Sequence, residues 1–117
     1  MSSQVYNFRS MFRGDTFKGL KIKLTQDDDT PIPLTNVKAI DCHFRKTFLS
    51  PCPSFTFSTS DNTIVIPDEN GNEFSLVERL MDYEASKYVY DVQFTYDDDS
   101  VVTLIHGEFI LKPDVTR

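Results

Sequence analysis

The feature that most constrains the fold is the strict alternation of residues 88–96, which read Tyr-Val-Tyr-Asp-Val-Gln-Phe-Thr-Tyr. At a period of two residues, one face of this segment carries Tyr88, Tyr90, Val92, Phe94 and Tyr96. An acidic turn at 97–100 separates it from a second apolar run at 101–111. Two such runs joined by a short turn predict a β-hairpin with one side on a core.

Several segments carry a family resemblance. They are Tyr-Val-Tyr-Asp-Val-Gln at 88–93, Val-Val-Thr-Leu-Ile-His-Gly-Glu-Phe at 101–109, Pro-Asp-Val-Thr-Arg at 113–117, and two earlier stretches at 14–24 and 33–37. Over nearly the whole chain, these motifs resemble a group of small phage and prophage β-sandwich proteins. The group includes the N-terminal domains of baseplate upper proteins and related tail and fibre-attachment modules. The resemblance implies a structural virion protein.

Two features depart from that group. Its members often place Gly just before the aromatic strand, where this chain has Ala85-Ser86-Lys87. Many relatives also continue past the Asp-Val-Thr ending into a fibre or carrier domain, whereas the last residue here is Arg117. The tight turn expected before the aromatic strand is therefore in question, and we expect a free-standing module.

Length and composition predict one all-β domain. A chain of 117 residues is near the usual domain size. Its apolar content is rich in Phe and Tyr, ten and five residues, which suit pleated sheets better than helices. We expect an antiparallel, immunoglobulin-like β-sandwich of about seven strands at 15–117, preceded by an N-terminal arm at 1–14 that pairs with its own domain or a neighbour.

Turn residues divide the chain into short predicted strands, spaced as in a sandwich. The expected strands are 17–24, 37–46, 55–57, 64–66, 74–76, 88–96 and 101–111. Between 76 and 87, Ser75 and Glu78 fit a capping box, and Leu76, Leu80 and Tyr83 recur at helical spacing, which predicts one short helical turn. Tyr88 after it resembles the tyrosine that ties the corner in immunoglobulin-like domains.

The cysteines and histidines do not predict a metal centre. Cys42 and His43 are neighbours in a predicted strand, so their side chains point to opposite faces and cannot share a zinc ion with Cys52 and His106. A reducing compartment also argues against a Cys42–Cys52 disulfide. Cys42 is expected to be a small core residue. We expect no metal and no cofactor.

Charge is distributed unevenly along the chain. Residues 1–24 hold five basic residues and one acid, a net +4, and the rest holds seven against seventeen, a net −10, which together give −6. A basic arm beside an acidic body favours head-to-tail association or docking on an acidic partner, although charges that only solvate a small domain give the same pattern. Without a basic stripe, nucleic acid is not an expected partner.

The N-terminal arm supplies the candidate interaction residues: Tyr6, Phe8, Arg9, Phe12 and Arg13. Alternation of its aromatic residues fits a strand inserted into a neighbouring subunit and a first strand on its own domain equally well. Arg13-Gly14-Asp15 is a tripeptide that some adhesive proteins use, but Gly14 and Asp15 also fit the start of a predicted strand.

The acidic clusters do not indicate an active site, and the common catalytic motifs are absent from the sequence. The triplets Asp27–Asp29 and Asp97–Asp99 lack the spaced ligands of an EF-hand loop and are expected to form turns, with weak calcium binding as the alternative. No nucleophile elbow, phosphate-binding glycine loop or His-Glu-x-x-His motif occurs. His106, beside Gly107, lies where a β-bulge could re-aim it, but a lone strand histidine is far more often structural or on the surface than catalytic. We predict no enzymatic activity.

The function expected from the resemblance is an assembly or adaptor module in the baseplate, tail or fibre attachment of a tailed phage or prophage. Its partners would be other virion proteins, including repeated copies of itself. No membrane segment or signal peptide is apparent, so we expect synthesis in the host cytoplasm and a place in the virion. The alternatives are a carbohydrate- or receptor-binding module and a capsid decoration or head-fibre anchoring protein.

Overall fold

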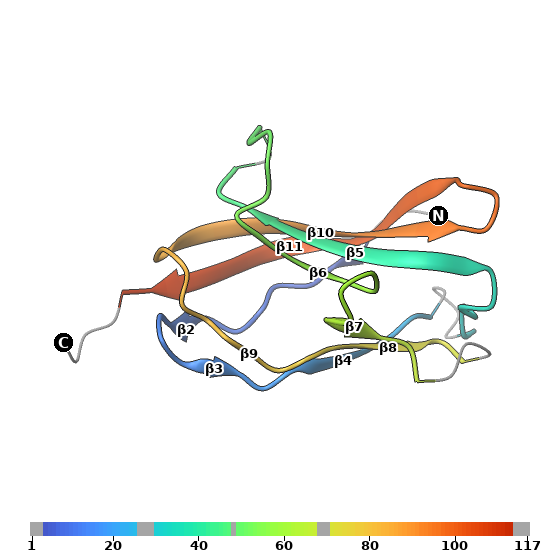
Figure 1. Ribbon diagram of the computed structural model, residues 1–117, viewed down its shortest axis with the longest axis horizontal. Coiled ribbons are helices and arrows are strands. Elements are labelled where there is room, and N and C mark those ends of the chain that lie inside the picture. Colours follow the sequence, from blue (N-terminus) through green and yellow to red (C-terminus); the bar gives the residue numbers. More distant parts are fainter. Residues whose placement is uncertain (1–3, 26–29, 48, 68–70, 114–117) are drawn as a thin grey trace.

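The computed structural model describes residues 4–25, 30–47, 49–67 and 71–113. These residues form eleven strands and no helix. Figure 1 shows two layers that face each other, a large sheet and a smaller group of strands. The all-β class predicted from the sequence is confirmed.

The large sheet is built around the predicted hairpin. Its central strands are β10 (Ser86–Tyr96) and β11 (Val101–Lys112), which pair antiparallel. On the other side of β10 lie β5 (Val37–Arg45) and then β6 (Phe55–Ser58), again antiparallel. All four were predicted as strands, because each has clear alternation or a short aromatic pattern between turn residues.

The N-terminal arm forms the opposite edge of the large sheet. Both β1 (Gln4–Val5) and β2 (Met11–Phe12) pair with β11 in parallel orientation. The large sheet is therefore not purely antiparallel, in contrast to the sequence prediction. No register could be predicted for these two-residue strands, because they are too short to show a period.

The second layer consists of two strand paths. One is β4 (Leu20–Lys23) beside β8 (Glu73–Leu76), followed by β7 (Ile64–Val65). The other is the pair β3 (Thr16–Phe17) and β9 (Arg79–Leu80). All of these pairs are antiparallel. Of these strands, only β9 was not expected.

Gly19 separates β3 from β4, which the sequence predicted as one strand. Its φ is +95°, and a Cβ atom there would lie 2.9 Å from the carbonyl oxygen of Leu76. A residue with a side chain would be strained in this conformation and would contact the facing backbone. Glycine therefore lets the chain change direction while staying close to its partner strand.

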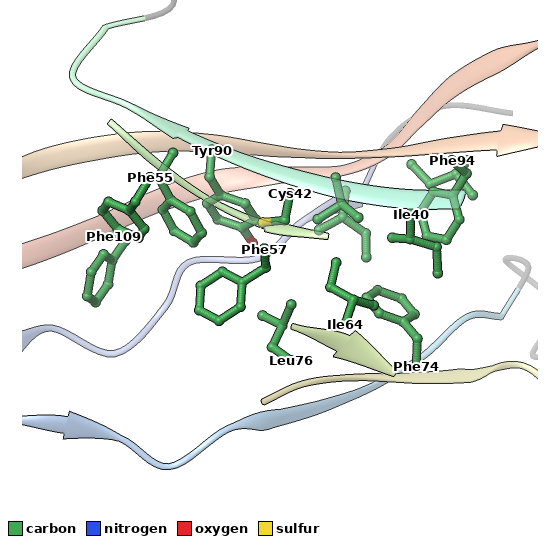
Figure 2. Packing of buried hydrophobic residues seen from close by; sticks show 14 of the residues in the cluster. Ile40, Cys42, Phe55, Phe57, Ile64, Phe74, Leu76, Tyr90, Phe94 and Phe109 are labelled. Atoms are coloured by element: carbon green, nitrogen blue, oxygen red, sulfur yellow. The ribbon is translucent and has the colours of Figure 1, made fainter. Parts of the chain in front are cut away.

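The core lies between the layers. Figure 2 shows Cys42, Phe57 and Tyr90 of the large sheet on one side and Ile64, Phe74 and Leu76 of the second layer on the other. The predicted inward face of β10 is confirmed, since its residues 88, 90, 92 and 94 are all buried. Burial of these large apolar side chains is the main stabilising contribution to such a fold.

A β-bulge in β11 changes which residues face the core. Val92 pairs with Ile105 and Gln93 pairs with Thr103, so Leu104 is left between the two pairs. As a result Leu104 and Ile105 are both buried although they are adjacent. The sequence suggested a bulge at His106 and Gly107, but these two residues pair in regular register with Asp91 and Tyr90, and the irregularity lies at Leu104 instead.

The predicted helical turn between residues 76 and 87 is wrong. After β8 the chain stays extended and forms β9, which pairs with β3. Leu80 is 55% exposed while Leu76 is buried, so the helical spacing does not correspond to a common apolar face. A single helical turn is costly to nucleate, and pairing with β3 gives the backbone partners at once.

Tyr88 ties the chain just before β10, as the sequence predicted. Its ring is buried, and its hydroxyl donates a hydrogen bond to the carbonyl oxygen of Glu84. The bond fixes the segment that leads into β10 against the core and satisfies the one polar atom of a buried ring.

Candidate functional site

The described part of the N-terminal arm, residues 4–14, runs along the edge of β11 in the chain's own sheet. The amide of Tyr6 donates to the carbonyl of His106 and the amide of Phe8 donates to the carbonyl of Glu108, both at 2.9 Å. In this single chain the arm packs on its own domain, and its insertion into a neighbouring subunit stays a prediction.

Phe8 anchors the arm in the core. Its ring lies 4.8 Å from that of Tyr90, 5.6 Å from Phe44 and 5.9 Å from Phe109, measured between centroids. The ring of Phe17 from the second layer is 6.2 Å away. Tilted and edge-on contacts at such distances are favourable for aromatic side chains. Phe8 is therefore a partly buried residue that packs against the core.

The backbone of the arm crosses directly over Gly107. A Cβ atom on residue 107 would stand 1.9 Å from the carbonyl oxygen of Tyr6 and 3.0 Å from Oδ1 of Asn7. The same Tyr6 oxygen accepts a hydrogen bond from the hydroxyl of Tyr90, and Asn7 Oδ1 accepts one from the amide of Glu108 at 3.0 Å. Only glycine leaves room for this contact.

The other arm residues predicted to bind partners reach the surface. Tyr6 is 44% exposed and Phe12 is 42% exposed. Arg9 and Arg13 are exposed as well. Nε of Arg13 lies 3.4 Å from a carboxylate oxygen of Asp82. The arm thus presents two aromatic rings and two cations on the outside while Phe8 holds it in place.

The tripeptide Arg13-Gly14-Asp15 forms the connection between β2 and β3. The amide of Gly14 donates to the carbonyl of Met81 at 2.9 Å, and the amide of Met81 donates to the carbonyl of Asp15 at 3.0 Å. Gly14 has a φ of +92°, which favours glycine. The tripeptide therefore has a structural role in the connection between β2 and β3.

A groove of about 320 Å³ opens between β1 and β4, where the edge of the large sheet faces the edge of the second layer. Its lining is mostly apolar and includes Val5, Tyr6, Leu20, Ile22, Leu24 and Ile105. Lys21 and Lys23 also border it. Sequence reasoning missed the groove, because its two walls lie far apart in the chain. The alternating lysines of 20–24 are the signal that could have marked an edge strand.

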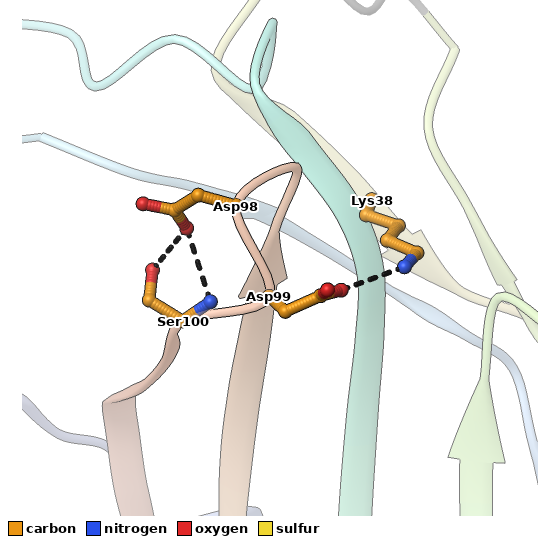
Figure 3. A network of polar contacts seen from close by, with 4 residues as sticks. All are labelled: Lys38, Asp98, Asp99 and Ser100. Carbon is orange, nitrogen blue, oxygen red and sulfur yellow. Dashed lines mark hydrogen bonds and ion pairs between the residues drawn. The ribbon is translucent and has the colours of Figure 1, made fainter.

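The acidic turn between β10 and β11 uses its side chains to hold the turn (Figure 3). One oxygen of Asp98 accepts hydrogen bonds from the amide and the hydroxyl of Ser100, at 3.0 and 2.6 Å. These bonds keep the pKa of Asp98 below its usual value. Asp99, with a φ of +67°, pairs with Lys38 at 2.8 Å. The triplet Asp27–Asp29 lies outside the described residues.

The four residues considered for zinc do not form one cluster of ligands. Cys42 is buried in the core, whereas its neighbour His43 faces the outside of the large sheet. Both cysteines are free thiols, and Cys52 is exposed. The strand register places His43 and His106 on either side of Asp91. Among the described residues, no group of three potential ligands is arranged to hold a metal ion.

The ionisable groups of the core are held neutral by burial. Desolvation raises the pKa of the Cys42 thiol and of the Tyr90 hydroxyl far above their usual values. Because the thiolate is the reactive form of cysteine, a thiol with a raised pKa is a poor nucleophile. Cys42 is therefore a core residue, as the sequence predicted.

Comparisons with known proteins add no relative: no model of a known protein family matches the chain, and no curated protein matches its sequence. The part of the chain that the structure describes contains no helix long and apolar enough to cross a membrane.

Proposed function

We propose that this chain is a non-enzymatic structural virion protein of a tailed phage or prophage. It would act as an assembly or adaptor module in the baseplate, the tail or the fibre attachment. The proposal to place it in a virion rests on the resemblance of residues 14–24, 33–37, 88–93, 101–109 and 113–117 to phage β-sandwich modules. Its mechanism is pairing and packing with other polypeptides, without a chemical reaction.

The observation that carries the assembly role is the pair of accessible strand edges at one side of the molecule. The exposed Val5 and Tyr6 of the arm lie across a groove from β4, whose outer edge has no partner strand among the described residues. Exposed strand edges readily accept another polypeptide.

We also propose that the two layers form an immunoglobulin-like β-sandwich. The face-to-face packing of the layers and the bond from the Tyr88 hydroxyl to the Glu84 carbonyl support this assignment. Such domains serve as repeated building blocks, but a fold alone does not define a function.

The experiment is quantitative mass spectrometry of phage particles purified by density gradient from a lysate of the strain that carries the gene. The expected result is this chain in the particle fraction at a constant ratio to a structural protein such as the major capsid protein. Its presence only in particle-free fractions of the same gradient would contradict the proposal.

The carbohydrate-binding alternative finds less support. It depended on spare aromatic side chains, but Tyr88 and Tyr90 are buried and Tyr83 stacks on Phe55 at 4.2 Å. Among the described residues, the exposed aromatic rings are Tyr6 and Phe12. The capsid-decoration alternative differs only in the location of the chain on the particle. Affinity purification from disrupted particles, with this chain as bait, would distinguish the two locations, because it identifies the neighbouring proteins as head or tail components.

A further inference from the structure

The outer edge of β4 is available for one more strand. Leu20, Lys21, Ile22 and Lys23 pair with residues 73–76 of β8 on one side only. In an extended strand the backbone groups of the other side point away from that partner. This edge is therefore a template for an added strand.

The groove next to this edge can receive apolar side chains from the added strand. Leu20 and Ile22 face its interior and are only half-buried, and Val5 on the opposite wall is 66% exposed. A volume of about 320 Å³ is near the lower limit of ligand sites in proteins, so it fits a few side chains and not a folded domain. The apolar lining favours a strand with small aliphatic residues on the inward face.

The charges at this edge select the partner. Lys21 and Lys23 are exposed on the outward face of β4, and neither is in an ion pair within the described residues. Opposite charges on neighbouring strands are favourable, whereas like charges are unfavourable. A strand with carboxylates at alternate positions would pair with both lysines.

The same lysines disfavour a second copy of β4 as the occupant. Antiparallel pairing of two β4 strands would bring Lys21 and Lys23 of one copy close to those of the other. Lysines on an edge strand are also a common protection against uncontrolled pairing. Lys21 and Lys23 therefore disfavour pairing with a basic or uncharged strand, whereas a strand that carries carboxylates can still pair with β4.

We propose that the groove between β1 and β4 binds an extended acidic segment of a different protein, which adds to β4 as a further strand. Its aliphatic side chains fill the groove and its carboxylates pair with Lys21 and Lys23. The inference rests on the proposed function as an assembly module and specifies the chemistry of one partner.

The test uses the full chain and two short blocked peptides, one alternating Glu with Val and the other alternating Lys with Val. Binding is measured by isothermal titration calorimetry, and the site is located by amide hydrogen exchange. The acidic peptide should bind and protect outer-edge amides of residues 20–23. The basic peptide should not bind.

A charge reversal makes the test specific. In the double variant Lys21→Glu/Lys23→Glu, affinity for the acidic peptide should fall at least about tenfold and the basic peptide should bind instead. The matched control is Lys38→Glu/Lys87→Glu, which changes the net charge equally but lies on the large sheet, and it should keep the preference for the acidic peptide.

The inference would be overturned by no binding of the acidic peptide, by equal affinity in the groove variant and the control, or by protection confined to other strands. Self-association of the chain that the groove variant abolishes would assign the groove to a second copy and would also overturn it. None of these results bears on whether the chain is in particles, so the proposed function fails or stands separately.

Discussion

The carbonyl group of Tyr6 lies so close over Gly107 that a single added carbon on residue 107 would stand 1.9 Å from its oxygen. The arm and β11 are thus fitted to each other at one point. The hydroxyl of Tyr90 donates to the same oxygen, so the core strand β10 also holds the arm. Because this arm forms one wall of the groove, its attachment determines the shape of the proposed binding surface.

Gly107→Ala should displace the arm while the rest of the fold remains. We expect a loss of about 2 kcal/mol in the free energy of unfolding, typical of an overpacked site. Hydrogen exchange of the full chain should show that the amides of Tyr6 and Phe8 lose protection, while those in the centre of β10 keep it. Unchanged protection of the two arm amides would contradict the close contact.

Tyr90→Phe removes the hydroxyl that donates to Tyr6 but keeps the ring, which stacks on Phe44 at 5.2 Å. The expected loss is about 1 kcal/mol, because one buried hydrogen bond disappears. The matched control is Tyr88→Phe, which removes the bond to Glu84 instead. Urea unfolding should show a loss in both variants, and only Tyr90→Phe should increase exchange at the amide of Tyr6.

Gly19→Ala should destabilise the second layer. The φ of +95° is unfavourable for alanine, and the added methyl group would lie 2.9 Å from the Leu76 carbonyl. We expect a loss of at least about 1 kcal/mol. Thermal unfolding measures this loss of stability. The control is Lys18→Ala, a substitution at the neighbouring exposed residue, which should leave the stability almost unchanged. A variant as stable as the parent chain would show that residue 19 does not need this conformation.

The strands with clear alternation could be predicted from the sequence, because a strand with one buried face carries an apolar residue at every second position. The inward residues of β10 and β5 follow directly from their spacing. The arm strands could not be predicted in the same way, since each spans two residues and their partner is a distant strand. Gly107 became informative only once the register placed Tyr6 above it.

The predicted helical turn failed for a related reason. The spacing of Leu76, Leu80 and Tyr83 is a local pattern, whereas β9 forms through pairing with β3, far away in the sequence. The groove is also a product of the tertiary fold, because Val5 and Ile22 meet across two layers. Local patterns therefore located most strands but not the surface between them.

Alkaline conditions should destabilise the chain through its buried thiol. Burial raises the pKa of Cys42 in the folded state, so above pH 9, where an exposed thiol ionises, the unfolded chain loses its proton first. Stability is full below that pH and falls above it, by about 1.4 kcal/mol per pH unit for this group. Urea unfolding between pH 7 and 10.5 should therefore show a smaller loss in Cys42→Ala than in the parent chain. The control is Cys52→Ala, which removes an exposed thiol and should keep the parent slope. Equal slopes in the two variants would show that Cys42 does not ionise differently in the folded and unfolded states.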